Sequence, residues 1–489
     1  MRSIFYLLLL LMPISLLAQN GSVQGCGTLD GRVDWLIRYQ ENPDSYVRTN
    51  DWLYVPLTIH VVGDDNGFGY YPLYRILNAL CVLNADFEAS NIRFFVEGDI
   101  RYINNSDYYD HDFAQGAQMM DENNIPNTIN CYIVLSPAGN CGYSAYNRGI
   151  ALNKGCISES DHTWAHEIGH YLSLPHTFFG WEGIEHTYAE AAPGMVNYGR
   201  ETELLDGSNC LDASDGFCDT PADYLNFRWS CNADAFSNVL QHDPTGAEFR
   251  SDGTFFMSYS FDECTGRFSE EQTAAMRANL LTERVNLLYD QTPPVLIEGT
   301  DIQAIQPLEG SLVENVNSAT LIWEVIPGAT EYIVQLSPVA TFAIGFQTHL
   351  VSDNQVVVYN LWSDRTWYWR VRPFNRYDPC VGFSEPFSFE TGNFILAASD
   401  FAHSLNWSLS PNPSTNNSKP LQLYLNAAFS FEAKLSLIHA NGQLLDQWTS
   451  DFVAGENTQR LEVEQLKPGI YFLMLESEMG SAVQRLIVY

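Results

Sequence analysis

Basic residues are scarce in this sequence, and beyond the apolar run at its amino terminus it has no stretch long enough to span a bilayer. Only 24 Lys and Arg residues stand against 59 Asp and Glu residues, so the formal net charge is −35. A surplus of negative charge repels the phosphates of nucleic acids and anionic membrane surfaces. The composition therefore argues against nucleic-acid binding, and the sequence predicts no transmembrane segment in the mature protein.

Long disordered stretches are not expected either, because 46% of the residues are hydrophobic and 13% are aromatic. A chain of 489 residues is too long for one ordinary core. We predict three globular domains and two processed ends.

The amino terminus has the pattern of a signal peptide. Arg2 precedes an apolar run from Ile4 to Leu17, and the small residue Ala18 follows. The run is short for a membrane span and has the charge and cleavage pattern of a secretory signal. We predict a signal peptide over 1–18, and export makes disulfides plausible for the ten cysteines.

Hydrophobic periodicity predicts an α/β (α+β) catalytic domain over 49–290. Leu53 to Val62 is strand-like, and apolar residues from Leu73 to Phe87 then recur at helical spacing. Further segments rich in β-branched and aromatic residues or in helix formers predict three more strand regions, 91–103, 128–137 and 142–153, and two helices, 161–174 and 269–288.

After Gln291 to Pro294 the pattern changes to short strands separated by turn residues. Core candidates are Trp323, Tyr332, Val334 and the alternating run 366–374. This layout resembles a fibronectin type III sandwich over 295–391.

The last part of the chain predicts a second all-β sandwich, with hairpin turns at Asn441-Gly442 and Pro468-Gly469. The segments SPNP, HANGQLL and LKPGIYFLML resemble the C-terminal sorting domain of type IX (Por) secretion cargo, here over 405–489. The final RLIVY departs from the lysines usual in that family. The resemblance implies the type IX secretion machinery as a partner and a secreted or cell-surface protein; the alternative is an ordinary small β domain.

The segment HEIGHYLSLPH carries the metal chemistry. His166 and His170 lie one helical turn apart, which is the spacing that one tetrahedral zinc ion can bridge, and His176 offers a third imidazole. Glu167 then lies beside the metal without having to ligate it. The alternative is three histidines that pack in a core.

HEIGHYLSLPHTF, together with FMSY at 256–259 and Asp262-Glu263-Cys264, resembles the metzincin clan and, within it, the pappalysin family. The resemblance implies a twisted mixed sheet with a zinc-site helix, and a secreted endopeptidase that cleaves protein or peptide substrates through a zinc-bound water. In this reading His166, His170 and His176 bind zinc, and Glu167 is the general base. Met257 forms the Met-turn, Tyr259 contacts metal or intermediate, and substrate lies along an edge strand within 142–153.

One position departs from the metzincin pattern. Ser173 stands where these enzymes usually carry glycine, and the chain must leave the helix sharply there. We expect Ser173 to adopt a strained or positive-φ conformation.

Cys26, in Gly25-Cys26-Gly27-Thr28, resembles the pappalysin pro-segment cysteine that ligates zinc and blocks the site. A zymogen with a pro-segment over 19–48 follows, cut at Arg48 or Arg38. Apart from Cys26, eight cysteines lie in the catalytic region, and because their number is even they can all form disulfides with one another. Cys380 is then expected to have no partner. The alternative is a disulfide from Cys26 to another cysteine such as Cys380.

Acidic residues crowd the segment after the zinc motif. Family members bind structural calcium near a similar DTP stretch, so Asp215, Asp219 and Thr220 are calcium candidates, although the spacing is not an EF-hand. A solvated acidic loop is the alternative.

Two other functions compete with this interpretation. In one, Glu185 or Glu190 is the third zinc ligand of a different HExxH enzyme; His176 and Met257 argue against it. In the other, the chain is a catalytically decayed protease that acts as an exported adhesin or binding protein, and the intact Glu167 argues against that.

Overall fold

The computed structural model describes residues 24–28, 31–298, 301–313, 318–392, 405–414, 421–427, 430–461, 466–477 and 480–489. The predicted signal peptide, 1–18, lies outside these residues. The chain divides into two compact units, and unit 1 comprises Met1–Thr300 with Ile326–Ile333 and Arg372–Gly382.

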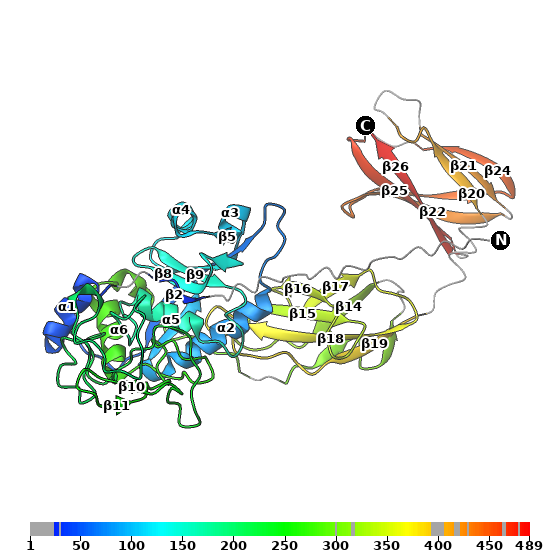
Figure 1. Cartoon of the computed structure of the whole chain (residues 1–489). Helices are drawn as coiled ribbons and strands as arrows, with labels where there is room; N and C mark the ends of the chain where they lie inside the picture. The colour runs from blue at the N-terminus through cyan, green and yellow to red at the C-terminus, as the bar shows by residue number, and fades with distance from the viewer. Residues whose placement is uncertain are drawn as a thin grey trace, which may run out of the picture. The chain divides into compact units, whose positions relative to one another are not determined.

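A seven-stranded mixed sheet organises unit 1 (Figure 1). The strand order is β1-β8-β9-β6-β2-β3, and β4 also pairs with β2. All of these neighbours run parallel except β8 and β9. The strands are β1 Gln24–Cys26, β2 Leu53–Gly63, β3 Ile92–Val96, β4 Arg101–Asn104, β6 Ile129–Val134, β8 Asn140–Ala145 and β9 Gly149–Asn153. Every residue of β2 is buried, as its mostly apolar sequence predicts for a central strand.

Six α-helices in the described part of unit 1 accompany the sheet: α1 Asp34–Glu41, α2 Leu73–Asp86, α3 Ser106–Tyr109, α4 Phe113–Asn123, α5 Thr163–Tyr171 and α6 Glu270–Thr282. Short elements complete it: β5 Asp110–His111 pairs with β7 Ser136–Pro137, β10 Gln241–His242 pairs with β11 Glu248–Phe249, and η1 Pro43–Ser45, η2 Glu88–Ser90, η3 Asn197–Gly199 and η4 Val285–Leu288 are 3₁₀ turns. The mixed α+β architecture agrees with the prediction.

Four predicted elements are divided in the structure, and one of them, the strand region expected over 128–137, becomes β6 and β7. The strand expected over 91–103 breaks into β3 and β4, because Gly98 between them has φ +70°. The segment 142–153 is a hairpin that turns at Asn147, with φ +64°. The helix expected over 269–288 ends at Thr282 and gives way to η4.

The disulfides correct the expected cysteine pairing. Cys380 is not alone, because it pairs with Cys81 inside unit 1, whereas Cys131 lies outside every disulfide. The other pairs are Cys141–Cys156, Cys210–Cys218 and Cys231–Cys264. Burial raises the pKa of the Cys131 thiol to about 12. A disulfide between Cys26 and Cys380 is likewise excluded.

Unit 2 contains the remaining strand residues except 331–333 and 372–374, which belong to unit 1. The first part of unit 2 holds two sheets. The three-stranded sheet has the order β12-β14-β17 and the five-stranded sheet the order β13-β19-β18-β15-β16. Their bounds are β12 Ala304–Gln306, β13 Ser311–Val313, β14 Ser318–Trp323, β15 Glu331–Ser337, β16 Gln347–Val351, β17 Gln355–Tyr359, β18 Arg365–Phe374 and β19 Phe387–Thr391. Trp323, Tyr332, Val334 and Trp369 are buried, as predicted.

The C-terminal strands form a three-stranded sheet, β20-β21-β24, and a four-stranded sheet, β23-β22-β25-β26, around one apolar core. They span β20 Asn406–Ser410, β21 Gln422–Ala427, β22 Phe431–His439, β23 Leu444–Phe452, β24 Gly455–Arg460, β25 Gly469–Ser477 and β26 Gly480–Val488. The hairpin turn at Asn441-Gly442 is confirmed. The one expected at Pro468-Gly469 is wrong, because β24 and β25, which flank it, belong to different sheets.

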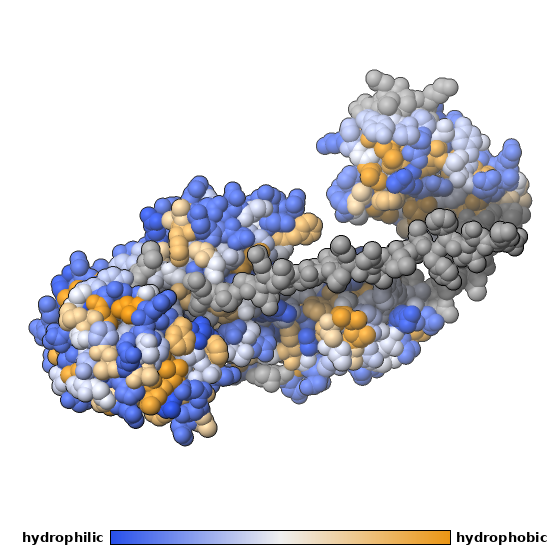
Figure 2. Space-filling model, in the orientation of Figure 1, coloured by the Kyte–Doolittle hydropathy of each residue, from blue (hydrophilic) through white to orange (hydrophobic). Residues whose placement is uncertain are grey.

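Hydrophilic residues cover most of the face of unit 1 drawn in Figure 2, in keeping with the acidic composition. Among the described residues, none of the helices combines the length and apolarity that a membrane crossing demands.

Candidate metal site

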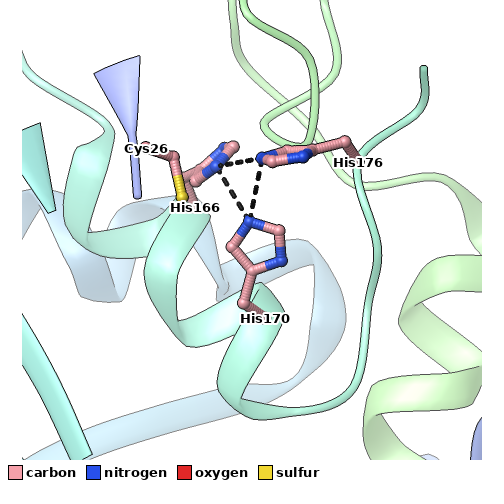
Figure 3. Close-up of side chains that lie close together, drawn as sticks. All are labelled: Cys26, His166, His170 and His176. Carbon is pink, nitrogen blue, oxygen red and sulfur yellow. Dashed lines mark hydrogen bonds between the residues drawn. The ribbon is translucent and has the colours of Figure 1, made fainter. Parts of the chain in front are cut away.

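Helix α5 holds two of the three histidines on one buried face. Every residue of this helix from Trp164 to Tyr171 is buried, so the helix is enclosed by the protein. The spacing of His166 and His170 places both imidazoles on the same side. His176 returns from the loop after the helix to face them (Figure 3).

The three Nε2 atoms form a nearly equilateral triangle. His170 Nε2 lies 3.1 Å from His166 Nε2 and 3.1 Å from His176 Nε2, and the third side is 3.2 Å. Zinc bound tetrahedrally at about 2.0–2.1 Å from each nitrogen would separate its ligand atoms by about 3.3 Å. The triangle therefore fits a metal ion, as the donor chemistry of three imidazoles also does.

The opposite ring nitrogens fix the tautomers of two histidines. His166 Nδ1 donates to the carbonyl of Phe256 at 2.6 Å, and His170 Nδ1 donates to the carbonyl of Leu174 at 2.8 Å. His176 Nδ1 lies 3.6 Å from a carboxylate oxygen of Glu182. With the proton on Nδ1, each Nε2 presents a lone pair to the centre of the triangle, as metal-binding histidines do.

Burial keeps the imidazoles of His166 and His170 neutral. Burial, together with the charge of His176, lowers the pKa of His166 to about 3, and the same causes lower the pKa of His170 well below its usual value. A metal ion therefore does not have to displace protons from these two side chains at neutral pH.

The chain leaves α5 through Ser173, which has φ +82°, as the departure from glycine predicted. This left-handed conformation turns the backbone so that His176 can reach the other histidines. The Ser173 hydroxyl accepts a hydrogen bond of 2.9 Å from the Asn279 amide on α6, and Ser173 is buried. The strained turn is thus anchored by a second helix.

Met257 lies in a tight turn under the histidines. The turn is closed by the hydrogen bond from the Ser258 N–H to the Phe255 carbonyl, 3.1 Å long. A side chain at Gly169 would come within 2.4 Å of the Met257 sulfur, so the helix and the turn are in close contact. Met257 is fully buried.

Glu167 is fully buried and lies against the sheet. A side chain at Gly142 on β8 would meet Oε1 of Glu167 at 2.9 Å, so this glycine makes room for the carboxylate. The Thr28 hydroxyl donates a hydrogen bond of 3.1 Å to Glu167 Oε2. The same hydroxyl accepts one of 2.9 Å from the Ser144 N–H on β8.

Cys26 completes the cluster of possible ligands. Its Sγ and one nitrogen of each histidine all lie within 4.8 Å of one another, and it is the one such group found among the described residues (Figure 3). Strand β1 brings it there by parallel pairing with β8, with Cys26 opposite Gly142. The Tyr259 hydroxyl donates to the Cys26 carbonyl at 2.9 Å, and the Tyr259 ring lies 4.7 Å from that of His176.

A cleft opens beside these residues. Its lining includes Cys26, His166, Glu167 and Tyr259, together with Arg228, which forms a 2.7 Å ion pair with Asp262. Glu185 and Glu190, the rival ligands, are exposed and lie outside the cluster of possible ligands.

The three calcium candidates are only partly brought together. Thr220 donates to the buried Asp215 at 3.0 Å, whereas Asp219 is exposed and accepts from the Glu271 N–H at the start of α6. Burial raises the pKa of Asp215 to about 8. Calcium binding at this segment stays a prediction.

Two contacts of the site were missed from the sequence. Thr28 is separated from Glu167 by 139 positions, so only the pairing of β1 with β8 reveals their contact. Asp223 was one of several acids in a loop, and nothing in the sequence distinguished its hydrogen bonds to Thr177 and Ser258.

Comparison with known protein sequences gives two findings. Residues 408–489 match the secretion system C-terminal sorting domain. An extracellular metalloprotease of Verticillium alfalfae is 27% identical over 206 residues, which cover 35% of this chain and 72% of that protein. The predicted sorting domain is confirmed despite the unusual terminal residues, and the chain is exported, either secreted or held at the cell surface.

Among solved structures, a fibronectin type III domain from the human KIAA0970 protein has a TM-score of 0.16 and 10% identity, and covers 18% of this chain and 74% of that one. The fn3 domain of human collagen alpha-1(XX) chain has a TM-score of 0.16 and 16% identity, and covers 22% of this chain and 97% of its own. The fibronectin type III assignment of 295–391 stays a prediction. The chain is thus a mixed α+β protein with all-β C-terminal parts and an export signal at its carboxyl end.

Proposed function

We propose that this chain is an exported zinc-dependent endopeptidase of the metzincin type, made as a zymogen that Cys26 inhibits. The observation that carries the proposal is the triangle of three Nε2 atoms, 3.1–3.2 Å apart, with the buried carboxylate of Glu167 beside it. His166, His170 and His176 would hold the metal. The similarity to an extracellular metalloprotease supports the same reading.

Zinc held by three neutral imidazoles supplies a Lewis acid that polarises a carbonyl and acidifies water. Glu167 would carry out the proton transfers. The buried Glu167 carboxylate would accept the proton of the attacking water and then deliver it to the departing amine nitrogen. Hydrolysis by this route needs no acyl-enzyme.

Strand β1 would keep the zymogen inactive. It occupies the edge of the sheet beside β8, where an extended substrate would otherwise add its own backbone hydrogen bonds. The Cys26 thiolate would take the coordination position that substrate chemistry needs. The Tyr259 hydroxyl, which donates to the Cys26 carbonyl, would be released towards the substrate once β1 leaves.

Activation would require cleavage of the chain between β1 and β2. Arg38 is exposed but lies within α1, whereas Arg48 is exposed and follows η1 outside any helix. Proteases bind their substrates as extended chains. We therefore favour Arg48 as the activation site.

Hydrolysis of casein tests the proposal. We would compare the full chain carrying Cys26→Ala with the chain that starts at Thr49, each with and without a zinc chelator. The matched control is the same chain with Glu167→Ala, checked for equal zinc content. From the chain that starts at Thr49, which lacks β1, we expect hydrolysis that the chelator abolishes and that Glu167→Ala lowers by at least about 10³-fold, the upper part of the range for proton transfer together with water positioning.

If the folded, zinc-loaded Cys26→Ala chain and the Thr49 chain both fail to cut casein and a panel of unrelated peptides, the peptidase proposal is wrong. Binding of a surface partner through 295–391 by that inactive protein would then establish the adhesin instead.

A further inference from the structure

Asp223 lies behind the metal site, outside the cluster of possible ligands. Its side chain is 2% exposed, and it follows the acidic loop in which the calcium candidates lie. Burying a carboxylate is unfavourable unless several donors satisfy it. The environment of Asp223 supplies four.

The four donors divide between the two carboxylate oxygens. Oδ2 accepts from the Thr177 hydroxyl at 2.8 Å and from the Ser258 hydroxyl at 2.9 Å. Oδ1 accepts from the Ser251 hydroxyl at 2.6 Å and from the Leu225 N–H at 3.1 Å.

Two of these donors adjoin metal-site residues directly. Thr177 follows the candidate ligand His176, and Ser258 follows Met257 in the turn beneath the site. The Thr177 N–H also donates to the Met257 carbonyl at 3.1 Å. One oxygen of Asp223 therefore connects the loop of the third histidine to the Met257 turn.

We propose that Asp223 is a positioning residue for the metal site: its Oδ2 holds the His176 loop against the Met257 turn so that His176 Nε2 stays in the triangle. The proposal rests on the proposed function and deepens it. His176 needs such support because, unlike His166 and His170, it is not carried by a helix. Residues that orient metal ligands from behind typically change metal affinity by 10–100-fold when they are replaced.

The surrounding contacts offer a matched control. Ser251 donates to the other oxygen of Asp223 and accepts from the Gln241 amide at 2.8 Å, so it extends the network away from the metal site. Its hydroxyl is as buried as those of Thr177 and Ser258, but it adjoins neither a candidate ligand nor the turn. Loss of Ser251 should lower stability without moving His176.

The test measures metal binding by the full chain with zinc and with cobalt(II) as the probe. We expect Thr177→Val and Ser258→Ala each to weaken zinc binding by about 10-fold in competition with a chelator, and to change the cobalt d–d absorption. Asp223→Asn should weaken zinc binding by more than either of these two substitutions. Ser251→Ala should leave zinc affinity and the cobalt spectrum within twofold of the unaltered chain, even where its melting temperature falls.

Equal weakening by Ser251→Ala and Thr177→Val would overturn the proposal, because Asp223 would then only stabilise the core. Unchanged metal binding in both Thr177→Val and Ser258→Ala would overturn it as well, and these two variants suffice if Asp223→Asn does not fold. An unaltered chain that binds neither zinc nor cobalt at the histidines would instead refute the proposed function.

Discussion

The Thr28 hydroxyl donates a hydrogen bond to Oε2 of Glu167, and the two residues lie 3.1 Å apart. The proposed general base is therefore engaged by the same short segment that brings Cys26 to the histidines. In the zymogen, Cys26 would occupy the open coordination position of the metal, and Thr28 would hydrogen-bond the base, Glu167.

Replacing Thr28 by valine should weaken latency. Valine keeps the β-branched shape but cannot donate to the carboxylate, and hydrogen bonds to charged groups contribute about 1.5–3 kcal/mol. We expect the unprocessed Thr28→Val chain to hydrolyse casein at least about 10-fold faster than the unaltered chain, measured before any cleavage at Arg48. Thr28→Ser, which keeps the hydroxyl, is the control, and equal activity of all three chains would show that Thr28 contributes nothing.

Cobalt substitution tests the role of Cys26. If the thiolate binds the metal, the cobalt-loaded full chain should show a sulfur-to-cobalt charge-transfer band in the near ultraviolet. Cys26→Ser should remove this band, and so should cleavage followed by removal of the pro-segment. Cys131→Ser is the matched control because its buried thiol lies on the sheet, outside the cluster of possible ligands. A band that persists in Cys26→Ser would contradict the proposed switch.

Two substitutions at Ser173 separate strain from hydrogen bonding. Ser173→Ala keeps the side chain at φ +82° but leaves the buried Asn279 amide without its acceptor, so we expect a loss of about 1–2 kcal/mol. Ser173→Gly loses the same hydrogen bond but relieves about 1 kcal/mol of strain. Urea denaturation should therefore rank the free energy of unfolding of Ser173→Gly above that of Ser173→Ala; the reverse order would mean that the turn stores no strain.

His60 should make the protein sensitive to acid. Burial lowers its pKa to about 4, and it faces Asn130 at 3.0 Å and stacks on Tyr132. Between pH 6.5 and 4 the unfolded chain binds a proton that the folded chain does not, so stability is present at neutral pH and falls as the pH falls. Protonation linked to His60 should lower the free energy of unfolding by about 3 kcal/mol between neutral pH and pH 4.

His60→Gln, whose side chain does not titrate, tests the contribution of His60 to this pH dependence. The free energy of unfolding of unit 1 should fall by about 2–3 kcal/mol less in the variant than in the unaltered chain when both are compared at pH 7 and pH 4.5. Identical pH dependence of the two proteins would exclude His60 as a source of acid lability.

The sequence was most informative where local spacing determines geometry. His166 and His170 are brought together by one helix, and the strain at Ser173 followed from the position where the chain must leave that helix. The central strand β2 was equally clear, because its run of apolar residues is buried throughout.

The remaining features depend on pairing between distant segments. The Cys81–Cys380 disulfide spans 299 positions, and no parity of cysteines specifies it. The contact of Thr28 with Glu167 follows from the register of β1 on β8, and the roles of the four donors to Asp223 follow from how loops fold over the site. Gly98 ended a strand because it adopts a positive φ, which the residue type permits without requiring it.

Zinc titration tests the central claim most directly. The metal-free chain that starts at Thr49, which lacks β1, would be given zinc in steps, and casein hydrolysis and bound zinc would be measured in the same samples. We predict that activity rises in proportion to zinc up to one equivalent per chain, and that His176→Ala abolishes both tight binding and activity. Hydrolysis that is unaffected by removing zinc, or a chain saturated with one zinc at its three histidines that cleaves nothing, would contradict the account.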